Sequence, residues 1–516
     1  MQVDDVKCEK RVRVDERTGR VVGLCYHAHK NSVSTELKTF DDCKAISAAL
    51  DDGEAHYGTE MTTVAFGPNR ENQYQITVVA ESPGCLNNDP EERTLRLVKM
   101  CIEIYVTDPR GEALRGRLST LQPDGASTFV KIGQKLFFEK PMTSDHPLHK
   151  QLSKLPLFNM YSGSGYCKQM TMGCEQKHAF KRTRERLKSE TKGCTFFEYP
   201  WKGTTLQSFL LASGEKKPDV QRMFAKGYAD AMNVPAMIDL YKAIADMADK
   251  EPSEFGNLQM QVRTLWKELQ LLGAYCGLIH SLLCDKVSLG QHLETISAIM
   301  HINLVCYRRN GTNMIPGQNF ANQQRYHRSI YWSVANAIED GIDEYFIFLD
   351  SGDRLEEFFG LQRTLSGGAS GTGDGMDCLQ CSERTSGVMQ CMGVLSRKPH
   401  LGKSSKHLKT TKDHQNPRSY LSTGGRNAAQ DKSRVEIKQV NLQSRYMQGR
   451  RSANKVLQAA GYPEDELDWN KMREESIDML RPRGNFVGIG TLDDEEDEVG
   501  IGAVDDEEDE GKKEGM

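Results

Sequence analysis

Three acidic residues that lie far apart in the chain have the setting of metal-binding carboxylates: Asp4, Asp108 and Glu356. Asp4, with Asp5 beside it, falls in an expected first strand, and Asp108 follows the apolar run that ends at Thr107. Two aspartates near strand ends and a glutamate from a distant helix can hold two Mg²⁺ or Mn²⁺ ions roughly 4 Å apart for phosphodiester chemistry. The chain has 72 acidic residues, so this triple needs support from the elements around it.

Glu356 stands near the start of an expected helix. The apolar run at residues 345–349 fits a covered strand or the end of a helix, and breaker and capping residues follow at 351–353. Asp353 and Glu356 have capping-box spacing, so the alternative is that Glu356 only completes a cap. Helical spacing assigns the neighbours to two sides, with Leu355, Phe358 and Phe359 towards the core, and Arg354 and Glu357 towards solvent.

A strongly basic helix is expected at residues 176–191. Its candidate DNA-binding side chains are Lys177, His178, Lys181, Arg182 and Arg184. Lysines and arginines of this kind contact phosphates without reading sequence. The alternative is an ordinary solvated helix face. His178 either orients a carboxylate or phosphate or has a structural polar role.

A zinc site is not expected. Cys378 and Cys381, taken with Cys391 and His400, are the best candidates, but this Cys-x-x-Cys has no matching second pair. The fourteen cysteines are scattered and stand mostly in apolar surroundings, which favours reduced thiols in an intracellular protein.

The elements that must position these residues are readable only in part. Residues 1–106 are expected to be mainly β, with a hairpin around 15–19, a strand pair at 62–66 and 74–79, and a helix at 93–101. Residues 102–107 fit either a further strand or a continuation of that helix. From about 218 to 340 the pattern is almost wholly helical, and its apolar stripes are expected to be core.

Charge and composition divide the rest of the chain. Residues 397–451 carry a net charge of +11, and residues 452–516 carry −13, including two copies of a 12-residue acidic repeat. We expect a basic linker at 401–434, a helical unit at 435–484 and a disordered acidic tail at 485–516. Mean hydropathy is −0.59, no apolar run approaches the ~18 residues of a membrane span, and the charged start is unlike a signal peptide.

Several blocks resemble a known family. Residues 4–7, 12–15 and 19–25 are similar to the first block of transposase-like proteins in fungal genomes, themselves distantly similar to P-element/THAP-type transposases. Further blocks follow in the same order, at 107–116, 177–182, 353–363, 413–417 and 446–450. The resemblance covers about residues 1–460. In the family an aspartate usually stands three places before His178, where this chain has Glu175.

The resemblance implies an α/β (α+β) fold with an RNase H-like DDE core. The core would occupy residues 1–192 and 341–400, interrupted by an all-helical insertion at 193–340. It also implies that Asp4, Asp108 and Glu356 hold Mg²⁺ or Mn²⁺ for DNA strand cleavage and transfer. The relatives carry a GTP-binding insertion, but no guanine-reading or phosphate-loop pattern is present here, so GTP is not carried over.

The expected function is therefore that of a transposon-derived nuclear protein that binds DNA, with possible self-association, no membrane, and an acidic tail suited to basic proteins. Whether it is an enzyme stays open. The alternatives are a catalytically inactive, domesticated DNA- or chromatin-binding protein and a protein-interaction scaffold. No sequence-specific DNA-binding module precedes Asp4, so such a module is expected to be absent or upstream.

Overall fold

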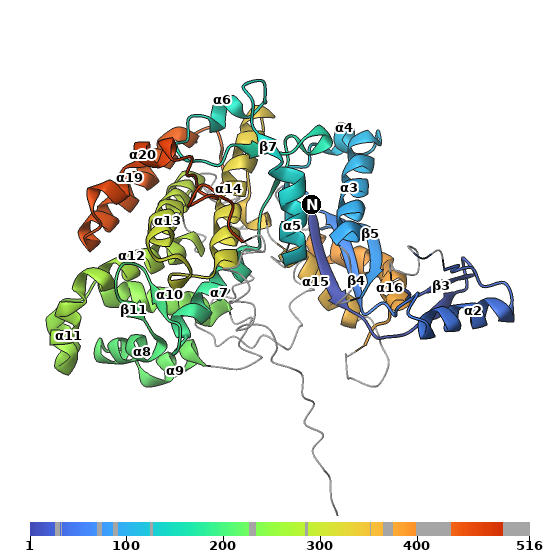
Figure 1. The fold of residues 1–516 in the computed structure, drawn as a ribbon, viewed down its shortest axis with the longest axis horizontal. Coiled ribbons are helices and arrows are strands. Elements are labelled where there is room, and N and C mark those ends of the chain that lie inside the picture. The colour runs from blue at the N-terminus through green and yellow to red at the C-terminus, as the bar shows by residue number, and fades with distance from the viewer. Residues whose placement is uncertain are drawn as a thin grey trace, which may run out of the picture.

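The fold was analysed in a computed structural model of the 516-residue chain. The structure describes residues 1–25, 31, 33–69, 75–85, 91–123, 127–225, 234–283, 287–350, 352–364, 375–398 and 435–488. The chain forms a sheet-containing half and a helical half that lie side by side (Figure 1).

A five-stranded mixed sheet is the frame of the first half. Its strands in chain order are β1 (Gln2–Lys7), β4 (Glu60–Phe66), β5 (Thr77–Gly84), β6 (Thr120–Pro123) and β9 (Thr171–Met172). In space they lie in the order β5-β4-β1-β6-β9. The pairs β1–β4 and β4–β5 are antiparallel, whereas β1–β6 and β6–β9 are parallel. The strands β1, β6 and β9 therefore end at the same edge of the sheet.

Helices cover both faces of this sheet. One face packs against α3 (Glu91–Thr107) and α5 (Ser127–Phe137), and the other against α15 (Asp353–Thr364) and α16 (Cys378–Arg397). Val3 belongs to the first core and Val6 to the second. Because side chains alternate along a strand, Asp4 lies on the same face as Val6, the face covered by α15.

An extension joins β1 to β4. It contains the hairpin β2 (Arg13–Asp15) and β3 (Arg20–Val22), and helix α2 (Phe40–Asp51). Gly19 closes the hairpin turn with a φ of +64°, a conformation that glycine adopts without steric cost. Five buried residues form the small core of this extension: Val21, Leu24, Ile46, Ala49 and Ala55.

The second half is built almost wholly of helices. Its main helices are α7 (Gln176–Lys188), α8 (Gly203–Ala212), α9 (Lys217–Phe224), α10 (Val234–Ala248), α11 (Gln259–Thr264), α12 (Trp266–Leu283), α13 (Leu289–Asn310), α14 (Gly317–Glu339), α19 (Leu442–Ala460) and α20 (Trp469–Glu474). The remaining elements of the chain are short: α4 (Glu112–Arg115), β7 (Lys140–Pro141), α6 (His149–Leu152), β8 (Tyr161–Ser162), β10 (Cys194–Thr195), β11 (Pro200–Trp201) and the 3₁₀ turns Gly165–Cys167, Pro252–Leu258, Gly311–Asn313, Ile347–Leu349 and Glu464–Leu467.

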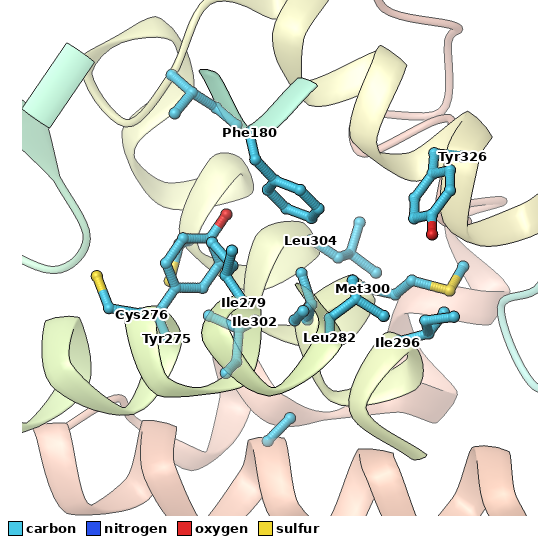
Figure 2. Packing of buried hydrophobic residues seen from close by; sticks show 14 of the residues in the cluster. Phe180, Tyr275, Cys276, Ile279, Leu282, Ile296, Met300, Ile302, Leu304 and Tyr326 are labelled. Carbon is cyan, nitrogen blue, oxygen red and sulfur yellow. The ribbon is translucent and has the colours of Figure 1, made fainter. Parts of the chain in front are cut away.

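One large hydrophobic core holds the helical half together. Figure 2 shows part of it, where Phe180 of α7 points towards Leu304 and Met300 of α13. Helix α14 lies at the centre, buried on almost every side, and contacts α7, α13 and β9. Its Arg328 donates a hydrogen bond to the carbonyl oxygen of Asn159 (3.0 Å) and another to the hydroxyl of Thr171 in β9. Helix α14 thereby ties the bundle to the edge strand of the sheet.

Several sequence-based expectations are confirmed. The hairpin around residues 15–19 and the antiparallel pair β4–β5 are present, and the described part of residues 218–340 is helical. The apolar stripes are core, since Leu293, Ile296 and Ile302 are fully buried. Leu355, Phe358 and Phe359 are buried as expected. Residues 435–484 do contain helices, and α19 packs along α13 as part of the large core.

Other expectations are corrected. Residues 102–107 continue α3 and do not form a strand. Residues 345–349 form neither a strand nor an α-helix but a buried segment with a single 3₁₀ turn. Arg354, expected in solvent, is buried, because its guanidinium donates to the carbonyl oxygens of Pro68 and Leu349 (both 2.9 Å).

The basic linker, His400 and the acidic repeat from residue 489 onward lie outside the described residues. The expected start of the disordered tail at residue 485 is corrected, because residues 485–488 are described and the ring of Phe486 packs against that of Tyr161 (ring centroids 5.3 Å apart). Among the described helices, none is both long and apolar enough to cross a membrane.

Candidate metal-binding site

Glu356 is part of a compact group of three side chains that the fold gathers from two elements. Glu356 lies in the first turn of α15, whereas Glu175 and His178 lie at the start of α7. One ligand atom from each of the three side chains lies within 4.8 Å of the other two. Glu356 therefore belongs to a shared group of polar side chains. The side chain of Asp353, the expected cap, lies outside the described residues.

Glu175 is the buried member of the group. Only 2% of its side chain is exposed, and its carboxylate pairs with the Nδ1 atom of His178 three residues later. Glu175 is the N-cap of α7, yet its side chain makes no capping hydrogen bond and is directed to His178 instead. A buried carboxylate requires a cation or hydrogen-bond donors, because desolvating an unpaired charge is costly. This makes Glu175 the best candidate for an anchor of a bound cation.

The parallel ladder sets the position of Glu175. β6 pairs with β9 through Thr120 and Thr171, and the ladder continues because the amide of Glu175 donates to the carbonyl oxygen of Pro123 (3.3 Å). Gly352, just before α15, comes within 3.4–3.6 Å of the Glu175 carboxylate, measured from the position of an added Cβ. A Cβ at Gly352 would make an ordinary van der Waals contact with this carboxylate, so Gly352 lies directly beside the site.

Asp4 lies on the same face of the same sheet edge. In the ladder, Gln2 pairs with Gln122, and Gln122 lies beside Gly173, whose added Cβ would collide with the Gln122 side chain. Two residues further along each strand come Asp4 and Glu175, which therefore lie on one face about 10 Å apart, twice the strand spacing. Asp4 has interactions of its own and is not in the three-residue group.

Asp108 is not brought to this site. It follows α3, which packs on the opposite face of the sheet from α15, and it pairs with Arg110 (3.0 Å). The Arg110 hydrogen bonds lower the pKa of Asp108 to about 2. Because α3 runs from the end of β5 to the start of β6, Asp108 lies near the edge where β6 begins, on a cavity of about 1000 Å³. The prediction that Asp108 joins Asp4 and Glu356 is wrong because the expected strand before it is helix.

Lys181 adds positive charge to the group. It lies one turn beyond His178 on the same side of α7, and its ammonium interacts with the charges of Glu185, Glu175 and Glu356. Burial is nevertheless the largest effect and lowers the pKa of Lys181. The site therefore combines two carboxylates, an imidazole and a partly buried ammonium.

The basic helix does not behave as one surface. Arg184 is 1% exposed and donates to the carbonyl oxygen of Met223 (2.9 Å), while Arg186 donates to that of Thr312 (2.8 Å). Lys188 donates to the carbonyl oxygen of Ala225 (2.7 Å). Arg184 is thus a structural residue, and its prediction as a DNA contact is wrong. Lys177, His178, Lys181 and Arg182 stay partly exposed.

Asp350 is a buried carboxylate that the sequence did not single out. It accepts hydrogen bonds from Thr120 (2.9 Å), Gln122 (2.8 Å) and Tyr345 (2.6 Å). These bonds fasten the segment before α15 to strand β6. Asp350 is a positioning residue, since the segment that it fixes leads directly into the helix that carries Glu356.

The cysteines considered for zinc lie elsewhere. Cys378 and Cys381 begin α16 and contact Cys8 of the chain segment after β1, with 3.7 Å between the Sγ atoms of Cys8 and Cys381. Cys391 lies ten residues beyond Cys381 on the same helix, about 15 Å along its axis. Cys391 therefore cannot join Cys378 and Cys381 as ligands of one metal ion.

Glu175 was not among the candidate site residues in the sequence. It was noted only as a departure from the family pattern, although its spacing from His178 was the signal.

Comparison with known proteins gives no match for this chain among family models, curated proteins or solved structures. The donor set itself fits a hard or borderline divalent cation, since two carboxylates and one imidazole suit Mg²⁺, Mn²⁺ or similar ions. The candidate function must therefore be argued from the chemistry of the site.

Proposed function

We propose that this protein is a transposon-derived DNA-binding protein with an RNase H-like core, and that its core cleaves and joins DNA strands with divalent cations. The strand order β5-β4-β1-β6-β9, with three antiparallel strands followed by two parallel ones, supports this plan. So does the long helical insertion between β9 and α15.

The observation that carries the proposal is the meeting of Glu356 with Glu175 and His178. Glu356 follows Glu175 and His178 by about 180 positions in the sequence. The three residues nevertheless share one site at the edge where three parallel strands end. Asp4 lies on the same face of that edge. A metal-dependent nuclease needs carboxylates converging from separate elements in this way.

The chain's own residues divide the work. Glu175, Glu356 and His178 would hold a cation, and Asp4, on β1 two strands from β9, would contribute to binding a second one. Bound Mg²⁺ or Mn²⁺ would supply Lewis-acid stabilisation of the attacking and leaving oxygens. Lys181 offers positive charge for a phosphate.

The test is nicking of supercoiled DNA by the purified chain with Mg²⁺ or Mn²⁺. Glu356→Gln should lower the rate by roughly 100-fold or more, the scale of losing a group that stabilises transition-state charge. Glu357→Gln is the matched control, because it removes the same charge from the next residue of α15, and it should stay within about twofold. Equal rates for Glu356→Gln and the unaltered chain would refute the assignment.

The same experiment separates the alternatives. A chain that binds DNA with steeply salt-dependent affinity but never nicks it is the inactive, domesticated form. A chain without any salt-dependent affinity for DNA is a protein-interaction scaffold.

A further inference from the structure

We propose that Cys25, His56 and Cys85 form a structural zinc site, separate from the site around Glu356. Their ligand atoms all lie within 4.8 Å of one another. The Sγ atom of Cys25 and the Nδ1 atom of His56 are 3.8 Å apart. Both cysteines are buried, and the histidine is partly buried. Three zinc-type ligands from three chain segments thus converge at one point.

Backbone pairing builds this site. The amide of Cys25 donates to the carbonyl oxygen of His56 (2.9 Å), and Leu24 pairs with Tyr57 in an isolated β-bridge. On the other side, the amide of Thr59 donates to the carbonyl oxygen of Gly84 (2.8 Å) at the end of β5. The segment around residues 56–59 therefore lies between the segments that carry Cys25 and Cys85, and main-chain hydrogen bonds hold Cys25, His56 and Gly84, the residue before Cys85.

The geometry suits tetrahedral zinc. With Zn–S near 2.3 Å and Zn–N near 2.0–2.1 Å, neighbouring ligand atoms of a tetrahedron lie roughly 3.5–3.8 Å apart. The separation between Cys25 and His56 already falls at this value. The remaining position would take water or a further side chain.

A role for the metal follows from the small core of the extension. Among the described residues, five buried side chains form that core, two of them alanines, and four partly buried apolar side chains pack against them. A unit of this size buries too little apolar surface to be stable on that basis alone, and a structural metal is one of the devices that compensates. Zinc at this point would join the extension to β4 and β5 of the main sheet.

Two other arrangements of thiols must be distinguished from the proposed zinc site. A disulfide between Cys25 and Cys85 would need no histidine. The contact between Cys8 and Cys381 also lies in this half of the molecule but includes no histidine in the described residues. A metal with one or two nitrogen ligands and two sulfur ligands therefore identifies the Cys25 site.

The test is elemental analysis of the full chain purified from zinc-supplemented cells, with X-ray absorption at the zinc edge. We expect one zinc per chain with two sulfur ligands and at least one imidazole nitrogen. Cys85→Ser should lower zinc content at least fivefold, while Cys43→Ser, which removes an exposed thiol from α2 of the same extension, should leave it unchanged.

Two results would overturn the proposal. One is zinc content unaffected by Cys85→Ser, or absorption spectra without two sulfur ligands. The other is a Cys25–Cys85 disulfide in the mass spectrum of the non-reduced protein. If Cys85→Ser does not fold, the ligand count in the unaltered chain decides the question alone.

Discussion

The two ends of helix α7 carry similar basic residues with opposite fates. Towards its start, His178 and Lys181 lie with Glu175 and Glu356 at the edge of the sheet. Towards its end, Arg184 and Arg186 are sealed into the helical half, where their guanidinium groups donate to backbone carbonyl oxygens. A run of positive charge in a sequence therefore does not define a surface for nucleic acid. What decides is which neighbouring element the helix packs against.

The largest effect is expected at the site end of α7. Glu175→Gln keeps the size of the side chain but removes the charge that a cation needs, so we predict a loss of roughly 100-fold or more in DNA nicking. Asp108→Asn, at the other edge of the sheet, should change the rate by less than about twofold. A larger loss in Asp108→Asn than in Glu175→Gln would reverse the assignment of the site.

The next largest effect is expected on the stability of the fold, at the buried end of α7. Arg184→Ala removes a hydrogen bond to Met223 and the packing of a long side chain, and leaves a buried carbonyl without its donor. We expect the free energy of unfolding in urea to fall by about 2–4 kcal/mol. Arg182→Ala, on a partly exposed position of the same helix, should cost less than about 0.5 kcal/mol. Similar losses of unfolding free energy in both variants would contradict the view that Arg184 is a buried structural residue and Arg182 is not.

The buried surroundings of α7 should also make stability depend on pH. The ring of His327 in α14 lies near that of Phe180 in α7, and burial lowers the pKa of His327 to about 3. Between pH 3 and the unfolded value near 6.5 the unfolded chain binds the extra proton, so stability falls as pH falls through this window. We predict that His327→Leu makes this slope shallower by up to about 1.4 kcal/mol per pH unit, measured by urea unfolding at several pH values. An unchanged slope would show that His327 is already charged in the fold.

The smallest effect concerns DNA affinity. Lys177 stays partly exposed at the start of α7, so Lys177→Ala should weaken DNA binding a few-fold and lower the slope of log affinity against log salt by about 1. Lys150→Ala, on the exposed surface of α6, is the control and should leave the slope unchanged. If both variants behave alike, α7 does not contact DNA.

Local patterns predicted much of this molecule, but not the contacts between distant segments. The hairpin around Gly19 and the buried stripe of α13 follow from turn residues and periodicity, which are local. Strands β6 and β9 have four and two residues, too short to show a pattern, and without them Glu175 could not be recognised as a neighbour of Asp4. The family resemblance implied a site residue at Asp108, but residues 102–107 before it continue helix α3, which packs on the opposite face of the sheet from Glu356.

The central claim is that Glu175, His178 and Glu356 share a divalent cation, and Mn²⁺ binding followed by electron paramagnetic resonance tests it most directly. We predict saturable binding that weakens at least ~10-fold in both Glu175→Gln and Glu356→Gln, and that is unchanged in Asp108→Asn. Undiminished Mn²⁺ affinity in the two glutamine variants, with both still folded, would contradict the account.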